Sequence, residues 1–162
     1  MKRLVCVFAI LCVLPLWATS LPQADSVLIM KAQRKLYLLK NGEVYRDYDI
    51  SLGANPIGHK RHLGDKRTPE GRYIIDYRNA QSRFYRSLHI SYPNKEDKSL
   101  ASQRGLNPGG AIFIHGLPNG RGHLVNNYRG YDWTHGCIAV TNQEVDEIWA
   151  QVPNGTPIEI KP

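Results

Sequence analysis

The chain has 162 residues, a formal net charge of +7 and 42% hydrophobic residues. This length predicts one domain with a sizeable core rather than several domains. The basic residues are scattered, and no internal repeat or low-complexity segment is present, so nucleic acid is not the expected partner.

The first twenty residues have the zones of a secretory signal peptide. Lys2 and Arg3 precede an apolar run over 4–17, and Ala18 and Ser20 are small residues suited to cleavage after Ser20. The run is shorter than the ~20 apolar residues that span a bilayer, so a membrane anchor is the weaker interpretation. Cleavage would leave about 142 residues (162 less 20) with no further apolar run able to cross a membrane. We therefore expect a protein that is periplasmic or otherwise exported to the cell wall.

The next segment has the pattern of β-structure. Val27–Met30 is a short apolar strand. Leu36–Leu39 and Val44–Tyr48 flank Asn41-Gly42, which is a strong signal for a hairpin with a type I′ turn. A long basic loop over 51–69 follows, because this stretch has several Gly and Pro residues and no periodicity.

The rest of the chain alternates strands with short helices. Apolar or alternating patterns predict strands at 71–77, 85–92, 111–114, 137–140 and 156–160. Helices are expected over 94–104, capped by Asn94, and from the capping box Thr141 and Glu144 to Val152. The Gly- and Asn-rich stretch 116–132 reads as a loop, with the character of a flap. The expected fold is a mainly β single domain with two or three short helices.

One cysteine stands out after export. Cys6 and Cys12 lie in the predicted signal peptide, so Cys137 would remain as a single thiol in an oxidising compartment, which marks it as a reactive group. It follows His135 and Gly136, and a second His-Gly pair begins at His115, at the end of a predicted buried strand.

This arrangement is typical of a cysteine nucleophile with a histidine base. His115 has the freedom to approach the sulfur in space, whereas His135 is held close in sequence and is assigned an orienting role. Gly136 leaves room for a substrate carbonyl to reach backbone N–H groups that could stabilise an oxyanion. The alternative is a turn beside a buried, inert cysteine. Export and the second His-Gly pair favour the catalytic interpretation.

These residues resemble the L,D-transpeptidase (YkuD-type) catalytic domain family. The matching motifs are Ile112-Phe113-Ile114-His115-Gly116, Thr134-His135-Gly136-Cys137, and the earlier Ser51-Leu52-Gly53, Gly58-His59-Lys60, Arg67-Thr68-Pro69-Glu70-Gly71 and Asn107-Pro108-Gly109-Gly110. The resemblance covers about residues 26–160. It implies a mainly β sandwich or barrel and acyl transfer on peptidoglycan stem peptides through a thioester on Cys137. It implies His115 as the base, His135 and Gly136 at the oxyanion site, and neither metal nor cofactor.

One departure from the family pattern leaves the acceptor open. Many members carry Arg two places after the Cys, where this chain has Ala139. Related enzymes transfer the acyl group to an amine, or use water to trim stems, cut crosslinks or detach a wall-bound protein. Crosslinking and hydrolysis therefore both remain possible outcomes, and the oligomeric state is not predicted.

Several neighbouring residues are candidate substrate contacts. Arg121 and Arg129 lie on the predicted flap, and Thr134 and Trp133 adjoin the nucleophile; Trp133 is equally suited to core packing. Lys60, Arg61 and Arg67 in the basic loop could bind stem-peptide carboxylates, although a solvated basic surface is the simpler interpretation for each.

Two rival functions belong to other classes. His59 and His62 have an H-x₂-H spacing, and together with His123, His115, His135 and Cys137 they allow a zinc peptidase. No catalytic Glu of the H-E-x-x-H kind accompanies them. A wall-binding module without turnover is the second rival. A protein that only binds the wall would not need a cysteine beside two histidines.

Overall fold

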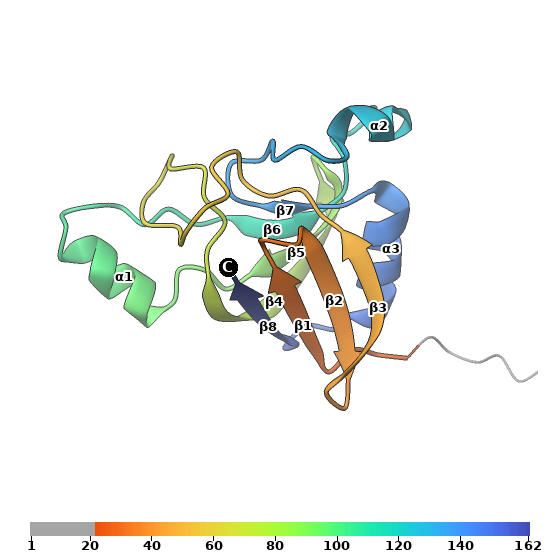
Figure 1. Cartoon of the computed structure of the whole chain (residues 1–162), viewed down its shortest axis with the longest axis horizontal. Helices are drawn as coiled ribbons and strands as arrows, with labels where there is room; N and C mark the ends of the chain where they lie inside the picture. Colours follow the sequence, from red (N-terminus) through yellow and green to blue (C-terminus); the bar gives the residue numbers. More distant parts are fainter. Residues whose placement is uncertain (1–21) are drawn as a thin grey trace, which may run out of the picture.

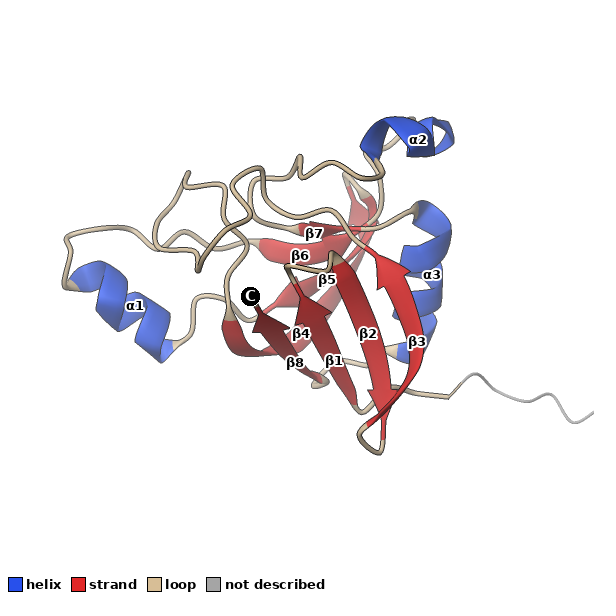
Figure 2. Cartoon of the chain, viewed as in Figure 1, coloured by secondary structure: helices blue, strands red, loops and turns tan. Residues whose placement is uncertain are grey.

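The computed structural model describes residues 22–162, so the predicted signal peptide at 1–20 lies outside the described residues. The described chain forms an eight-stranded sheet in the order β3-β2-β1-β8-β4-β5-β6-β7, with helices at its margins (Figure 1). The strands are β1 (Ser26–Met30), β2 (Lys35–Lys40), β3 (Glu43–Asp49), β4 (Gly71–Ser82), β5 (Tyr85–Ile90), β6 (Ile112–His115), β7 (Ile138–Ala139) and β8 (Pro157–Lys161). The helices are α1 (Lys95–Ser102), α2 (Val125–Tyr128) and α3 (Asn142–Gln151), with a 3₁₀ turn, η1 (Gly122–Leu124). The predicted mainly β single domain with short helices is confirmed (Figure 2).

The β2–β3 hairpin forms as the sequence predicts. Asn41 and Gly42 both have positive φ, 53° and 79°, as a type I′ turn requires. β1 pairs antiparallel with β2, so that Val27 faces Leu38 and Ile29 faces Leu36 across the ladder. All four side chains are buried, because alternate residues of each strand point to the core.

β4 is the strand that joins the two halves of the sheet. Its first residues pair with β8 and the remainder with β5. It runs to Ser82, five residues beyond the end predicted from the sequence, because the polar stretch 78–82 forms an exposed hairpin arm with no apolar alternation to reveal it. The two edge strands of the sheet, β3 and β7, are also linked. Ser51, which follows β3, makes an antiparallel bridge with Ala139 in β7. This bridge closes the sheet toward a barrel.

The helices begin at the predicted caps. The Asn94 side chain accepts a hydrogen bond from the Asp97 N–H, and Thr141 does the same for Glu144; in each case the acidic side chain bonds back to the cap. α3 packs against β5 and β6 of the sheet and buries Val145 and Ile148. No helix within residues 22–162 is long and apolar enough to cross a membrane.

The stretch 116–132 differs from the predicted loop. It contains η1 and α2, although its Gly and Asn residues have low helix propensity. Side-chain contacts support the helical turns: the Tyr128 ring packs on Trp133, outside the stretch, with ring centroids 5.1 Å apart, and within it Arg121 Nη1 donates to the Tyr128 hydroxyl at 3.3 Å.

Candidate active site

Neighbouring strands carry the two residues assigned to the chemistry. β6, which ends at His115, pairs parallel with β7, which begins one residue after Cys137. The Cys137 thiol lies against the β6 backbone and donates to the Ala111 carbonyl, with a sulfur–oxygen distance of 3.6 Å. No hydrogen bond joins the Cys137 and His115 side chains in the part of the chain that the structure describes. Such bonds are often long in a free enzyme and tighten when substrate binds.

His115 is held as a neutral imidazole. Its side chain is 3% exposed, and Nδ1 lies 2.7 Å from the Gly116 carbonyl oxygen. A carbonyl only accepts, so Nδ1 carries the hydrogen and Nε2 keeps a free lone pair. Burial lowers the pKa of His115 to about 4. The ring, packed against Phe84 and Trp133, is therefore in the form that accepts a proton.

The Cys137 thiol is also neutral at rest. Burial raises its pKa, and this effect outweighs the opposing influence of the Phe113 N–H and the nearby charge of Lys60. A raised thiol pKa and a lowered histidine pKa disfavour a preformed thiolate–imidazolium pair. The arrangement instead suits proton transfer to the imidazole during attack on a substrate.

Thr134 connects the two ends of the motif. Its hydroxyl donates to the Cys137 carbonyl at 2.7 Å and accepts from the Gly136 N–H at 3.1 Å, and the residue is buried. Its observed contacts thus shape the turn that presents the nucleophile, while substrate binding by Thr134 stays a prediction. The Gly136 N–H is engaged inside the turn, which leaves the N–H groups of His135 and Cys137 as candidate oxyanion donors.

Gly136 has a structural reason to be glycine beyond the room it leaves for substrate. Its φ is +126°, and a Cβ added there would lie 2.6 Å from the Arg67 carbonyl oxygen. We expect Gly136→Ala to lower the free energy of unfolding by about 3 kcal/mol or more, because a strained backbone and a backbone clash act together. Gly155→Ala is the control: φ is +90° with open space around it, so only a strain cost of about 1–2 kcal/mol is expected. Equal losses in urea unfolding would contradict this assignment.

The remaining predicted site residues are dispersed around the turn. His135 is exposed and makes no side-chain hydrogen bond or ion pair within residues 22–162. Arg129 pairs with Glu144 of α3 at 2.9 Å, and Arg121 bonds to Tyr128. Trp133 packs beside His115, with its buried Nε1 unpartnered among the described residues. Their roles toward substrate stay predictions.

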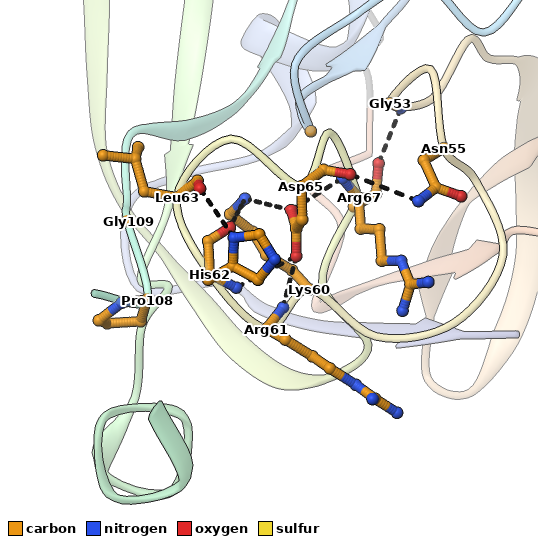
Figure 3. Close-up of polar contacts among 12 residues, drawn as sticks. Gly53, Asn55, Lys60, Arg61, His62, Leu63, Asp65, Arg67, Pro108 and Gly109 are labelled. Carbon is orange, nitrogen blue, oxygen red and sulfur yellow. Dashed lines mark hydrogen bonds and ion pairs between the residues drawn. The ribbon is translucent and has the colours of Figure 1, made fainter. Parts of the chain in front are cut away.

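The basic loop contains an ordered ion pair that sequence reasoning missed. The Asp65 carboxylate accepts from Lys60 Nζ at 2.8 Å and from the backbone N–H groups of Arg61, His62 and Arg67 (Figure 3). Burial alone would raise the pKa of Asp65, but these hydrogen bonds hold it at about 2. The signal available in the sequence was a lone Asp five residues after a Lys in a loop of otherwise basic residues.

We expect Asp65→Asn to destabilise the protein by about 3–5 kcal/mol, because it leaves the Lys60 charge buried without its partner. The Lys60 and Asp65 side chains are only 3% and 7% exposed. Asp47→Asn is the matched control, since Asp47 pairs with Lys35 at the surface and such pairs contribute at most about 1 kcal/mol. Chemical denaturation of both variants tests the difference, and a loss for Asp65→Asn no larger than the control would refute the role of this pair.

The histidines of the zinc interpretation have other contacts. His59 Nε2 lies 3.1 Å from the Asp97 carboxylate, and Nδ1 accepts from the Glu70 N–H at 3.0 Å. His62 Nδ1 lies 2.9 Å from the carbonyl of Leu63. Within residues 22–162, no three His, Cys, Asp or Glu side chains form a group that could hold a metal ion.

Comparison with known proteins identifies the class. The L,D-transpeptidase catalytic domain (YkuD) family matches residues 24–160, so the chain belongs to this family. YafK of Escherichia coli (strain K12), itself named only provisionally as an L,D-transpeptidase, is 32% identical over 127 residues, which cover 75% of this chain and 44% of YafK. The chain thus spans less than half the length of this curated relative.

Solved structures share the fold. The helical cell shape determining protein Pgp2 (K307A mutant) of Campylobacter jejuni is 26% identical, with a TM-score of 0.63 over 88% of this chain and 49% of that one. Bd1075 of Bdellovibrio bacteriovorus is 25% identical, with a TM-score of 0.56 over 84% of this chain and 47% of that one. An L,D-transpeptidase from Xylanimonas cellulosilytica, 18% identical with a TM-score of 0.54 over 86% of this chain and 61% of that one, shows the common fold alone.

Proposed function

We propose that this protein is an exported, cysteine-dependent acyl-transfer enzyme that acts on peptidoglycan stem peptides. Membership of the L,D-transpeptidase family supports a peptidoglycan-related function. The observation that carries the proposal for the site is a thiol held against the strand that ends in a neutral, tautomer-fixed histidine. The cell-shape role named for the Campylobacter jejuni relative is part of the same proposal.

The proposed reaction has two halves. His115 Nε2 takes the thiol proton as the Cys137 sulfur attacks a stem-peptide carbonyl, and backbone N–H groups of the motif stabilise the oxyanion. The proton then passes to the leaving amine, whose departure gives a thioester on Cys137. In the second half His115 deprotonates the acceptor, and attack by the acceptor releases the thiol.

The acceptor of the acyl group determines which reaction the protein catalyses. An amine of a second stem gives a crosslink, and water gives stem trimming, crosslink cleavage or release of a wall-bound protein. Incubating the purified protein with defined muropeptides and analysing the products by mass spectrometry separates these outcomes. Dimers, trimmed monomers and split dimers each identify one reaction. A product spectrum identical to that of buffer alone, from folded protein, would refute the proposal.

Two reagents separate the cysteine mechanism from the zinc alternative. We expect activity to survive EDTA and to be lost with iodoacetamide, because the nucleophile is a thiol. Loss with EDTA and recovery with Zn²⁺ would overturn the assignment of Cys137. A wall-binding module without turnover would instead leave Cys137 unacylated while wall binding persisted in Cys137→Ala.

A further inference from the structure

The basic residues around the motif fall into two groups, according to whether their side chains have a hydrogen-bond or ion-pair partner. Lys60 is neutralised inside the protein by Asp65, Arg129 is paired with Glu144, and Arg121 bonds to Tyr128. Arg61 and Arg67 behave differently: neither guanidinium has a hydrogen bond or ion pair among residues 22–162. In Figure 3 both side chains extend away from the loop backbone, and no dashed line reaches either guanidinium group.

Arg61 and Arg67 line an open cleft together with a third arginine from another element. The cleft has a volume of about 410 Å³, and Arg104, which follows α1, completes its wall together with Leu106. Arg104 is exposed and also lacks a side-chain partner in the described part of the chain. Three arginines from two segments that lie far apart in the sequence thus line one cleft.

Within residues 22–162, Asp65 is the acidic residue that lines the cleft, and the nearby acidic groups Asp65, Glu70 and Asp97 are engaged elsewhere. The Asp65 carboxylate is taken up by Lys60 and by backbone N–H groups, Glu70 is paired with Lys31, and Asp97 contacts His59 while capping α1. Unpaired arginines in a cleft attract carboxylate or phosphate, which the planar guanidinium binds through two parallel hydrogen bonds.

The loop that carries the arginines packs directly on the nucleophile motif. The Arg67 carbonyl oxygen occupies the space where Gly136 would carry a side chain, and a Cβ on Gly53 would lie 3.1 Å from the Gly136 Cα. On its other side the loop contacts the turn that leads into β6, through the Leu63 N–H and the Asn107 carbonyl at 2.8 Å. The cleft is therefore fixed relative to Cys137 by backbone contacts on both sides.

We propose that the cleft lined by Arg61, Arg67 and Arg104 binds a free carboxylate of the stem peptide whose carbonyl Cys137 attacks. This inference rests on the proposed function and names the feature of the substrate that this surface recognises. A peptide carboxylate fits better than a membrane surface because the arginines line a cleft in the loop whose backbone packs on the nucleophile motif.

The test uses the full exported chain with Arg61, Arg67 and Arg104 each replaced by Gln, alone and together. We expect the triple variant to raise the KM for a stem peptide with free carboxylates by about 10–100-fold, with kcat changed less than ~3-fold, since charge-assisted hydrogen bonds carry binding. The same stem with amidated carboxylates should have a high KM with wild type and variant alike. Arg72→Gln, which removes an exposed arginine paired with Glu159 on the β4–β8 part of the sheet, should leave KM unchanged.

Three outcomes overturn the subsite. They are an unchanged KM in the triple variant, an equal rise for free and amidated stems, or a loss confined to binding of phosphatidylglycerol vesicles, which would assign the cleft to a phosphate surface. Thermal unfolding of the single variants identifies any folding defect. Direct binding of the free and amidated stems to Cys137→Ala separates the two proposals. If binding depends on the arginines but the wild-type protein shows no turnover, the proposed enzymatic activity is wrong and the carboxylate subsite is still supported.

Discussion

Replacing Cys137 by Ala should abolish acyl transfer, with a loss of at least ~10³-fold, because no other group in the proposed mechanism can form the covalent intermediate. The fold should be nearly unaffected, since the thiol is half-buried and the hydrogen bond that it donates to the Ala111 carbonyl is a weak contact at 3.6 Å. Intact-protein mass spectrometry with a carbapenem, a reagent of the kind that acylates this family, measures the effect directly. Wild type should gain one stable adduct on Cys137, and Cys137→Ala should gain none.

Ala139 offers the matched control for this experiment. It lies two residues beyond Cys137 and is buried in the bridge to Ser51, so Ala139→Ser probes a change of similar size in the same segment without touching the sulfur. We expect this variant to form the adduct. An adduct on Cys137→Ala, located at another residue by peptide mapping, would show that the nucleophile lies elsewhere.

Replacing His115 by Gln should slow acylation of Cys137 by about 10²–10⁴-fold, the usual contribution of a general base. The pH profile carries more information than the rate. With the pKa of His115 at about 4, wild-type acylation should lose activity only as the pH falls toward 4, not near the ordinary histidine value of ~6.5. Without the base only the thiolate reacts, so the rate of His115→Gln should climb about tenfold per pH unit toward the raised pKa of Cys137. Parallel profiles for the two proteins would show that His115 is not the base.

The same burial makes stability depend on pH in a defined window. The pKa of His115 falls from ~6.5 in the unfolded chain to about 4 in the fold, so between these values the unfolded state binds more protons. The free energy of unfolding should therefore decrease as the pH drops from about 6.5 to 4, by about 3 kcal/mol from this group. His115→Gln should flatten that part of the curve in urea titrations at fixed pH. A slope identical to wild type would show that burial does not suppress protonation of His115.

Local signals in the sequence were reliable where the chain's own chemistry decides the structure. The Asn41-Gly42 turn formed because both residues tolerate positive φ, and both helix caps formed because their side chains bond to backbone groups three residues away. β4 was predicted too short, since its outer arm is polar and is ordered only by pairing with β5. The short helix α2 was missed because contacts with Trp133, and not propensity, support it.

The sequence by itself determined the family, the mainly β architecture and the candidate pair Cys137 and His115. Motif spacing, the alternation of apolar and polar residues, and turn chemistry all depend on residues that are close together in the sequence. Only the tertiary structure decided the state of that pair: burial, which no local pattern reports, makes both the thiol and the imidazole neutral at rest. Tertiary contacts also decided which basic residues are free. Lys60 is neutralised by a carboxylate, whereas Arg61 and Arg67 line one cleft with Arg104, which lies far away in the sequence. Charge pairing depends on distance in space, so composition alone could not separate these residues.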